Sequence, residues 1–338
     1  MRLFILILLL LSSLQCMAGE KSLKIATYNI YFLDDGISPE RKANLQAVLK
    51  LLDADIIGFQ EIEDRAALEN ILGPEYRIAM IDDPDEVQEL ALAVRTPFRI
   101  VSQQYVFPNI ELDLQFPRTR DLLEVTVAGE GLEFVCLVHH AKSRRGGRLN
   151  NDARREGAAR LMAQYIREKL AGRNVVLMGD FNDNPDDRSM NILEYDDPEA
   201  PGGIDNHEDT FMFNTTEQLL AKDICSFGFG WRFKDTELNG EFDPVVPGSR
   251  EENNRWRDKE HDYMRDVYIK ETLLDQILVS LNLKTYVTAV GVLNQAVAVK
   301  GTPSHIKFTD RGLEYTERGS LASDHIPVWM TLSMPGKN

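Results

Sequence analysis

The sequence predicts an α/β protein in which β-sheets are covered by helices. Apolar runs of strand length alternate with amphipathic stretches of helical length along most of the 338 residues. Hydrophobic residues make up 43% of the chain, which is enough to bury a large core. The sequence contains no internal repeat and no boundary that would cut off a second core. These observations favour one large domain.

The spacing of apolar residues places the expected elements along the chain. The strands are Leu23–Phe32, Asp55–Glu61, Tyr76–Ile81, Leu90–Arg95, Ile100–Phe107, Leu122–Ala128, Glu133–His140, Asn174–Gly179, Leu273–Ser280, Val287–Leu293 and Val328–Leu332. The helices are Glu40–Leu52, Arg65–Leu72, Asn151–Ala171 and Arg188–Leu193. Pro39 precedes the first helix and Gly172 follows the third, as suits a helix start and a helix stop. Residues 196–269 are rich in proline, glycine, asparagine and charge, and they predict long loops beside a functional site.

The first residues of the chain predict a signal for export. Arg2 is followed by an apolar run that ends at Leu11 and is too short to span a bilayer. Ala18 closes a suitable cleavage site, so we interpret residues 1–18 as a signal peptide and residues 22–334 as the domain. The mature protein is therefore expected to be secreted or periplasmic, with no transmembrane segment. Lipid attachment at Cys16 is the less favoured alternative, because residues 13–15 fit a lipoprotein cleavage box poorly.

Cysteine content and charge narrow the class of function. Cys136 and Cys225 remain after cleavage; we expect no disulfide between them and no zinc site. The net charge of −16 argues against tight binding of nucleic acid, which depends on Lys and Arg contacts. One region is nevertheless basic. Its residues are Lys142, Arg144, Arg145, Arg148, Arg154, Arg155 and Arg160.

Polar side chains recur where apolar strand-like runs begin or end. They are Asn29, Glu61, Asp180, Asn182, Asp324 and His325. An uncompensated carboxylate at the end of a buried strand destabilises the fold, because removing its charge from water costs free energy. Several such carboxylates converging make sense if a divalent cation neutralises them. The pattern therefore indicates a metal-dependent phosphoester hydrolase.

Taken singly, these residues have simpler explanations. Glu61 alone would more often be a surface or helix-capping acid, and Asn29 a turn residue. The acids and amides at 180, 182 and 184 suggest a calcium loop. However, Pro185 stands where an EF-hand needs glycine, and Asn191 where it needs a bidentate glutamate. A calcium loop is therefore excluded.

Two further features point to catalytic histidines. His139 and His140 are adjacent at a strand end, and strand alternation points them to opposite faces, so one of them at most can face a site. Asp275 interrupts an apolar run, which is costly unless the carboxylate meets a partner such as histidine. A carboxylate that orients an imidazole and raises its basicity is a recurring catalytic device.

In their order along the chain, these segments resemble the endonuclease/exonuclease/phosphatase superfamily with the DNase I-like fold. The resemblance runs from about residue 23 to residue 333. Its motifs are Thr-Tyr-Asn29, Gln-Glu61, His140-Ala-Lys-Ser, Gly-Asp-Phe-Asn182, Leu-Asp275 and Ser-Asp-His325. Each motif is short, but six in this order are specific. The resemblance implies a four-layer α/β sandwich of two packed mixed β-sheets flanked by helices, with the site at one end.

The resemblance also implies roles for individual residues. Glu61, Asp324 and Asn29 would hold the metal, with Mg²⁺ expected and Mn²⁺ or Ca²⁺ as alternatives. Asp180 would orient or deprotonate the attacking water, and Asn182 would bind the phosphate. His325, supported by Asp275, would contact the scissile phosphate or act as the general base. His140 would stabilise the pentavalent transition state or protonate the leaving oxygen.

Cationic residues are expected to bind substrate. Arg120 resembles the family's arginine that opens a strand, with Arg118 as the alternative register. Lys142, Arg144 and Arg145 predict a cationic loop at the mouth of the site, suited to a polyanionic backbone. A solvated surface balanced by the chain's many acids is an equal alternative.

The expected function is an exported, divalent-metal-dependent phosphodiesterase, foremost a non-specific nuclease that acts on nucleic acid as a monomer without a stable protein partner. Export and His140 argue against a repair endonuclease, and the segment 322–325 lacks the Cys-Asp-Arg of inositol-phosphate phosphatases. A sphingomyelinase-like enzyme, with an aromatic hairpin from Phe227, Phe229 and Trp231, and a small phosphoester phosphatase stay open. An inactive exported binding protein is less favoured, because every catalytic position holds a competent residue.

Overall fold

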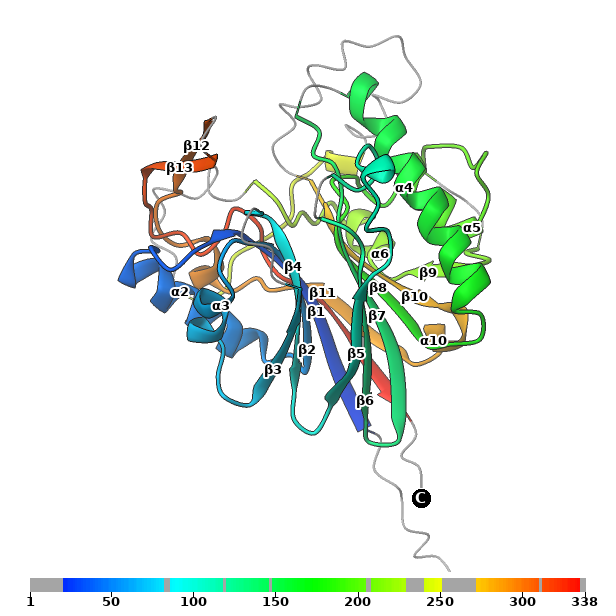
Figure 1. Cartoon of the computed structure of the whole chain (residues 1–338), viewed down its shortest axis with the longest axis horizontal. Helices are drawn as coiled ribbons and strands as arrows, with labels where there is room; N and C mark the ends of the chain where they lie inside the picture. Colours follow the sequence, from blue (N-terminus) through cyan, green and yellow to red (C-terminus); the bar gives the residue numbers. More distant parts are fainter. Residues whose placement is uncertain are drawn as a thin grey trace, which may run out of the picture.

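A computed structural model of the chain describes residues 21–81, 86–117, 120–145, 148–204, 208–228, 240–250, 272–309 and 312–334. Two six-stranded sheets pack face to face and carry helices on their outer surfaces (Figure 1). The predicted four-layer α/β sandwich is thereby confirmed. The expected signal peptide, Arg118, Phe229 and Trp231 lie outside the described residues.

The first sheet has the strand order β11-β14-β1-β2-β4-β3. Its central strands β1 (Lys21–Leu33) and β2 (Ile56–Ile62) are parallel and are joined by helix α2 (Pro39–Leu52). All other neighbours in this sheet are antiparallel. The remaining elements are α3 (Arg65–Ile71), β3 (Tyr76–Met80), β4 (Glu89–Arg95), β11 (Val287–Val292) and β14 (Val328–Met334).

The second sheet has the strand order β5-β6-β7-β8-β10-β9. Its central strands β7 (Leu132–His140) and β8 (Val175–Asp180) are parallel and are joined by helix α4 (Arg148–Lys169). The other neighbours are antiparallel here as well. The remaining elements are β5 (Arg99–Tyr105), β6 (Leu123–Gly129), α5 (Arg188–Tyr195), β9 (Met212–Asn214) and β10 (Asp275–Ser280).

Both sheets follow one plan, which the sequence does not reveal as a repeat. Each has a single parallel pair at its centre, joined by a helix and flanked by antiparallel strands. The carboxyl ends of a parallel pair lie at one end of the sheet, and antiparallel neighbours begin at that same end. The plan therefore gathers strand-end residues from both sheets at one end of the sandwich.

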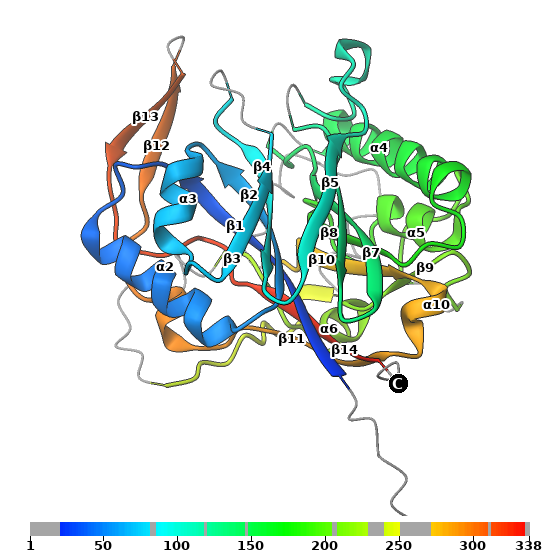
Figure 2. The same cartoon turned by 60° about the horizontal axis from the view of Figure 1, so that its bottom comes forward.

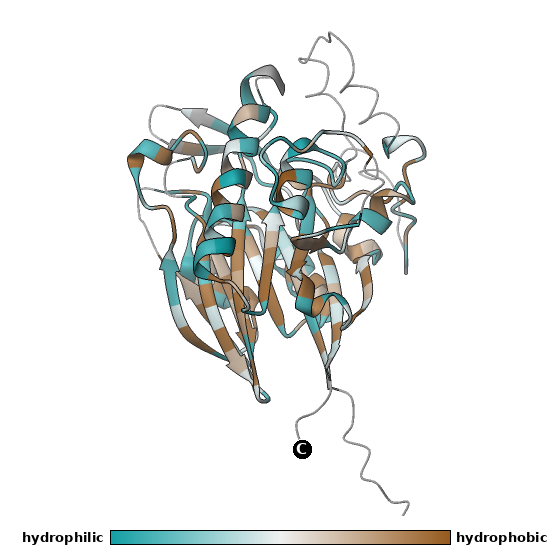
Figure 3. Ribbon diagram, turned by 90° about the vertical axis from the view of Figure 1, so that its right-hand side faces the viewer, coloured by the Kyte–Doolittle hydropathy of each residue, from teal (hydrophilic) through white to brown (hydrophobic). Residues whose placement is uncertain are grey.

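Apolar residues fill the interior in two clusters. One lies between the sheets and beneath α2 and α3, and the other lies between the second sheet and the helices α4 and α5. The strands are accordingly the most hydrophobic part of the ribbon, whereas the helices and loops carry many hydrophilic residues (Figure 3). The sheets approach closely at Gly58 of β2, where an added Cβ would lie 2.8 Å from the sulfur of Met178.

All eleven predicted strands and all four predicted helices are present, with boundaries shifted by at most three residues. The sequence did not predict the hairpin of β12 (His305–Thr309) and β13 (Gly312–Glu317), which stands apart from both sheets on the side of α2 and α3 (Figure 2). Its two strands do show apolar alternation, with Ile306 and Phe308 in one and Leu313 and Tyr315 in the other, but the runs are short and were not assigned as strands.

Within residues 196–269, which we expected to form loops, the described part also contains β9 and helix α6 (Glu217–Leu220). Strand β9 has only three residues and is recognisable through its pairing with β10. Helix α10 (Leu281–Lys284) and the 3₁₀ helices at Ile110–Leu112 and Ala296–Val299 were not predicted either. Cys136 and Cys225 are buried and do not form a disulfide with each other. None of the described helices has the length and apolar character needed to cross a membrane.

Candidate active site

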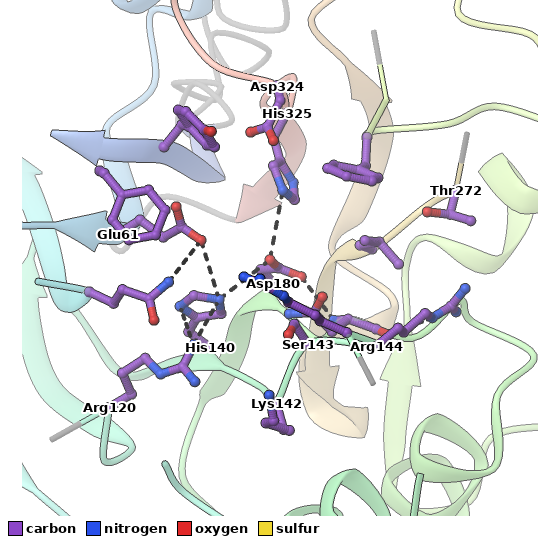
Figure 4. A pocket seen from close by; sticks show the side chains of 17 residues that line it. Glu61, Arg120, His140, Lys142, Ser143, Arg144, Asp180, Thr272, Asp324 and His325 are labelled. Carbon is purple, nitrogen blue, oxygen red and sulfur yellow. Dashed lines mark hydrogen bonds and ion pairs between the residues drawn. The ribbon is translucent and has the colours of Figure 1, made fainter. Parts of the chain in front are cut away.

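A cleft of about 590 Å³ opens at the end of the sandwich where the parallel pairs terminate. Ten of the twelve predicted site residues line it (Figure 4). They are Glu61, Arg120, His140, Lys142, Arg144, Arg145, Asp180, Asn182, Asp324 and His325. The other two, Asn29 and Asp275, lie directly behind it and bond to Asp180 and His325.

Left-handed backbone turns aim side chains into the cleft. Tyr31, Phe32, Glu61 and Asn182 line it and have φ angles of 52°, 49°, 63° and 52°. Non-glycine residues rarely adopt this region, and such residues gather at functional sites. The register between β1 and β2 is irregular between Asn29 and Leu33, so the end of β1 is bulged where it meets Glu61.

Glu61 and Asp324 carry buried carboxylate oxygens that have no hydrogen-bond donor among the described residues. These atoms are Glu61 Oε2 and Asp324 Oδ1. The other Glu61 oxygen, Oε1, accepts a hydrogen bond from Gln88 Nε2 at 3.2 Å. Burial, followed by the charge of Asp324, raises the pKa of Glu61 to about 7. Burial also raises the pKa of Asp324.

Two buried acceptors without donors fit a bound cation. Among the described residues, no three acidic, histidine or cysteine side chains converge to form a closed metal site. A cation here would thus take one or two carboxylates and complete its coordination with water, which is the habit of Mg²⁺. Asn29 Oδ1 accepts a hydrogen bond from the Tyr31 amide at 3.0 Å, which leaves one lone pair of this oxygen for a cation.

Asp180 is the hub that joins the two sheets. Its Oδ2 accepts a hydrogen bond from Asn29 Nδ2 at 3.1 Å, and its Oδ1 accepts one from the Asn182 amide at 2.8 Å. His140 Nε2 and His325 Nε2 lie 3.7 Å and 3.8 Å from Asp180 Oδ2 (Figure 4). Burial raises the pKa of Asp180 to about 6.

The two site histidines differ in charge, because their pKa values shift in opposite directions. His325 Nδ1 lies 2.7 Å from Asp275 Oδ2, which also accepts a hydrogen bond from Ser226 Oγ at 2.6 Å. Burial alone would lower the pKa of His325, but Asp275 and the neighbouring acids outweigh it and raise the pKa to about 10. His140 has Arg120 Nη1 at 3.2 Å from its Nε2. Burial and the Arg120 charge keep the pKa of His140 well below its usual value, so its ring is neutral.

The adjacent histidines point to opposite faces, as strand alternation predicted. His139 packs edge-on against Phe116 and Phe181, at ring-centroid distances of 5.7 Å and 5.4 Å, in the cluster beneath α4. Gly179 makes this strand end possible. An added Cβ would lie 1.9 Å from the backbone oxygen of His139, so only glycine lets the ends of β7 and β8 meet.

The predicted basic region divides into two groups. Arg144 Nε donates to the Asn182 carbonyl at 2.9 Å, and its Nη2 pairs with Asp187 at 2.9 Å. The guanidinium groups of Arg154, Arg155 and Arg160 likewise contact backbone carbonyls or acids of the fold. Lys142 and Arg145 line the cleft and form no ion pair with an acid in the described part of the chain.

Several residues of the site were not foreseen. Gln88 orients Glu61, and Ser226 supports Asp275. Phe227, which the sequence suggested only for an aromatic hairpin, has its ring centroid 4.8 Å from that of His325. An isolated glutamine, serine or phenylalanine carries no signal in the sequence, because only its position opposite a catalytic group gives it a role.

The comparisons with known proteins agree with this geometry. The sequence matches the model of the Endonuclease/Exonuclease/phosphatase family over residues 26–325. No curated protein matches the sequence significantly. TDP2 of D. rerio, solved with a single strand DNA product, has a TM-score of 0.55 at 18% identity and covers 93% of this chain and 100% of its own. A Bacteroides thetaiotaomicron mannosyl-6-phosphatase has a TM-score of 0.51 at 18% identity and covers 92% of this chain and 100% of its own.

At these identities the solved structures show a shared fold. The family match is stronger evidence of what kind of protein this is, because its range from residue 26 to residue 325 contains all twelve residues of the site. The chain therefore belongs to the endonuclease/exonuclease/phosphatase family of phosphoester hydrolases.

Proposed function

We propose that this hydrolase is a divalent-metal-dependent phosphodiesterase that cleaves nucleic acid without base specificity. One observation carries the choice of substrate: Lys142 and Arg145 line the cleft without an acidic partner among the described residues. The chain has 54 acidic and 38 basic residues, so cations left unpaired at a catalytic cleft are a feature to explain. A polyanionic backbone running past the scissile bond would pair with them.

The metal-binding part of the site would consist of Glu61 and Asp324, with Asn29 alongside. When bound, Mg²⁺ would neutralise the negative charge that develops on the reacting phosphate. Asp180 would receive the proton of the attacking water. Its two hydrogen bonds fix the carboxylate, and its pKa of about 6 leaves it ionised at neutral pH yet able to accept a proton.

The histidines would then act on the phosphate in different ways. His325 is a cation whose Nδ1 is held by Asp275, so its Nε2 is available to donate a hydrogen bond to an equatorial oxygen. His140 is neutral, so one ring nitrogen accepts from Arg120 Nη1, which lies 3.3 Å from Nδ1 and 3.2 Å from Nε2, and the other would donate to the phosphate. Arg144 also lines the cleft, and its contact with the Asn182 carbonyl would hold Asn182 in its left-handed conformation.

Nicking of supercoiled plasmid tests the proposal. The mature protein should nick DNA with Mg²⁺ and lose the activity in EDTA. His325→Ala and Asp180→Ala should each reduce the rate by about 10²–10⁴-fold, as removal of a general acid or base does. A folded wild-type protein that binds Mg²⁺ without nicking DNA or RNA would overturn the choice of substrate.

The basic rim provides a sharper second test. The double variant Lys142→Ala/Arg145→Ala should weaken cleavage of DNA and reduce its salt dependence, while hydrolysis of bis(p-nitrophenyl) phosphate stays unchanged. Arg160→Ala is the matched control, because Arg160 pairs with Glu156 on the same helix. An equal loss on both substrates would assign Lys142 and Arg145 to the chemistry rather than to the polyanion.

A small-phosphoester phosphatase is the second candidate. The cleft volume of about 590 Å³ favours it, because this is the size of a pocket that encloses a small ligand. Release of phosphate from sugar phosphates, without plasmid nicking, would select this alternative. The sphingomyelinase-like alternative loses support, because Phe227 packs against His325.

Export forms part of the same proposal. Residues 1–18 have the pattern of a cleaved signal peptide, so the enzyme would act on nucleic acid outside the cytoplasm as a monomer. Mass spectrometry of the secreted or periplasmic protein should find an N-terminus at Gly19. An N-terminus at a lipid-modified Cys16 would select the anchored alternative.

A further inference from the structure

Arg41 is a buried arginine whose charge opposes the rise that burial causes in the pKa of Asp324, without a direct ion pair between them. It lies in the first turn of α2, is only 1% exposed and forms no ion pair within the described part of the chain. A buried charge is costly unless it is paired or fully hydrogen-bonded. Its presence therefore requires a reason beyond the packing of α2.

The guanidinium of Arg41 joins two segments that are far apart in the sequence. Its Nη2 donates to the carbonyls of Ile30 and Tyr31 at 2.7 Å and 2.6 Å, and its Nε donates to the carbonyl of Ala322 at 3.2 Å. Ile30 and Tyr31 follow Asn29 directly, in the bulge that ends β1. Ala322 comes two residues before Asp324.

The second sheet has a matching arginine. Arg155 lies on α4, which joins the parallel pair β7 and β8 as α2 joins β1 and β2, and it is 2% exposed. Its Nη1 donates to the Lys142 carbonyl at 3.0 Å, and its Nε lies 2.8 Å from Asp183 Oδ2. Lys142 comes two residues after His140, and Asp183 three residues after Asp180.

We infer that Arg41 and Arg155 are positioning residues with separate tasks: Arg41 assembles the metal-binding half of the site, and Arg155 assembles the half that acts on water and phosphate. Arg41 clamps the segments that carry Asn29 and Asp324. Arg155 clamps those that carry His140 and Asp180. The inference rests on the proposed metal site at Glu61 and Asp324.

The two tasks predict different defects. Lysine keeps the charge but lacks the planar fork that reaches two segments at once. Arg41→Lys should weaken Mg²⁺ binding by roughly 10–100-fold, the usual effect of losing a group that orients metal ligands. At saturating Mg²⁺ its kcat should recover. Arg155→Lys should leave Mg²⁺ binding unchanged and lower kcat, with KM little affected.

The experiment is isothermal titration of the metal-free full-length variants with Mg²⁺, followed by kcat and KM at saturating metal. Arg95→Met is the control, because Arg95 pairs with Asp53 and Asp55 at the opposite end of β2. It should lose stability and keep both Mg²⁺ affinity and kcat. Arg41→Gln and thermal unfolding of every variant are included, so that misfolding is recognised.

Each outcome has a distinct meaning. Wild-type protein that binds no Mg²⁺ would refute the proposed metal site itself. Wild-type binding that Arg41→Lys leaves intact would overturn the inference for Arg41, and equal weakening by Arg155→Lys would overturn the division of tasks. Failure of both Arg41 variants to fold would make Arg41 a residue of general stability and would also overturn the inference.

Discussion

At the scale of single residues, the neighbours of a side chain decide its chemistry more than its type does. His140 and His325 are both buried in one cleft, yet the first is neutral and the second is a cation. Arg120 lies beside the first, and Asp275 beside the second. The site therefore obtains a neutral donor and a charged one from the same residue type.

The ion pair of His325 predicts a stability that depends on pH. The pKa of His325 is about 10 in the fold and 6.5 without its partners, so the folded state binds this proton more tightly than the unfolded state does. In metal-free protein this contribution is fully present below pH 6.5 and is lost as the pH rises through 10. Asp275→Asn should remove most of it.

Urea unfolding of wild type and Asp275→Asn at several pH values in EDTA measures this difference. The variant should be less stable than the wild type at pH 6.5, and the gap should close towards pH 10. Asp275→Asn should also lower the rate of phosphodiester cleavage, because the imidazole loses its fixed orientation. A gap that does not change with pH would show that His325 is not charged in the fold.

At the scale of elements, the site depends on how strands end. The ends of β1, β2 and β8 contain left-handed residues, and β7 meets β8 through Gly179. These irregular ends let Asn29, Glu61 and Asp180 leave their sheets and converge. Regular strands would keep the same side chains on the faces of the sheets.

Gly179→Ala should therefore damage both stability and activity. The added Cβ would lie 1.9 Å from the His139 carbonyl oxygen, so β7 and β8 must move apart where they carry His140 and Asp180. We expect a loss of about 1–3 kcal/mol in the free energy of unfolding, as for overpacking. The fall in kcat should exceed tenfold, a loss of transition-state stabilisation above about 1.4 kcal/mol.

Gly172→Ala is the matched control. Gly172 has a φ of 74° after α4, and no atom lies within 4 Å of an added Cβ. The substitution should lower the free energy of unfolding by about 1–2 kcal/mol through backbone strain. It should leave kcat unchanged. Denaturant unfolding and initial rates measure both variants, and normal kcat in Gly179→Ala would exclude a role for the β7–β8 contact.

At the scale of the whole molecule, the site buries carboxylates whose charged form is disfavoured by loss of water and, for Glu61, by the charge of Asp324, and a cation would relieve this cost. Glu61 and Asp324 are buried acids with raised pKa values. The pKa of Glu61 is about 7 in the fold and 4.5 as a reference, so its ionisation destabilises the metal-free fold as the pH rises through 7. A ligand that binds only the folded protein raises its stability.

Mg²⁺ should accordingly raise the melting temperature of the full-length protein, and EDTA should reverse the change. At 100 times Kd the gain is about 2.7 kcal/mol, or a shift of roughly 4 °C for a protein of this size. Glu61→Gln should lose the shift, and above pH 7 its metal-free form should melt no lower than wild type. Differential scanning calorimetry measures both effects. An undiminished Mg²⁺ shift in Glu61→Gln would place the metal elsewhere.

The sequence by itself determined the sheets, the helices and the strand-end residues of the site. Short-range spacing specifies these features: alternation separated His139 from His140, and an interrupted apolar run marked Asp275. Most of the site could be predicted for this reason, because strand-end polar residues are visible along the chain.

The tertiary structure alone decided which cations remain unpaired and which residues support the site. Lys142 and Arg144 are neighbours in the basic segment, yet Arg144 pairs with Asp187 while Lys142 lines the cleft without a described acid. Arg41 reaches Ala322 across 281 positions, and Asn29 reaches Asp180 across 151. Such contacts depend on how the two sheets pack. The spacing of residues along the chain does not specify that packing.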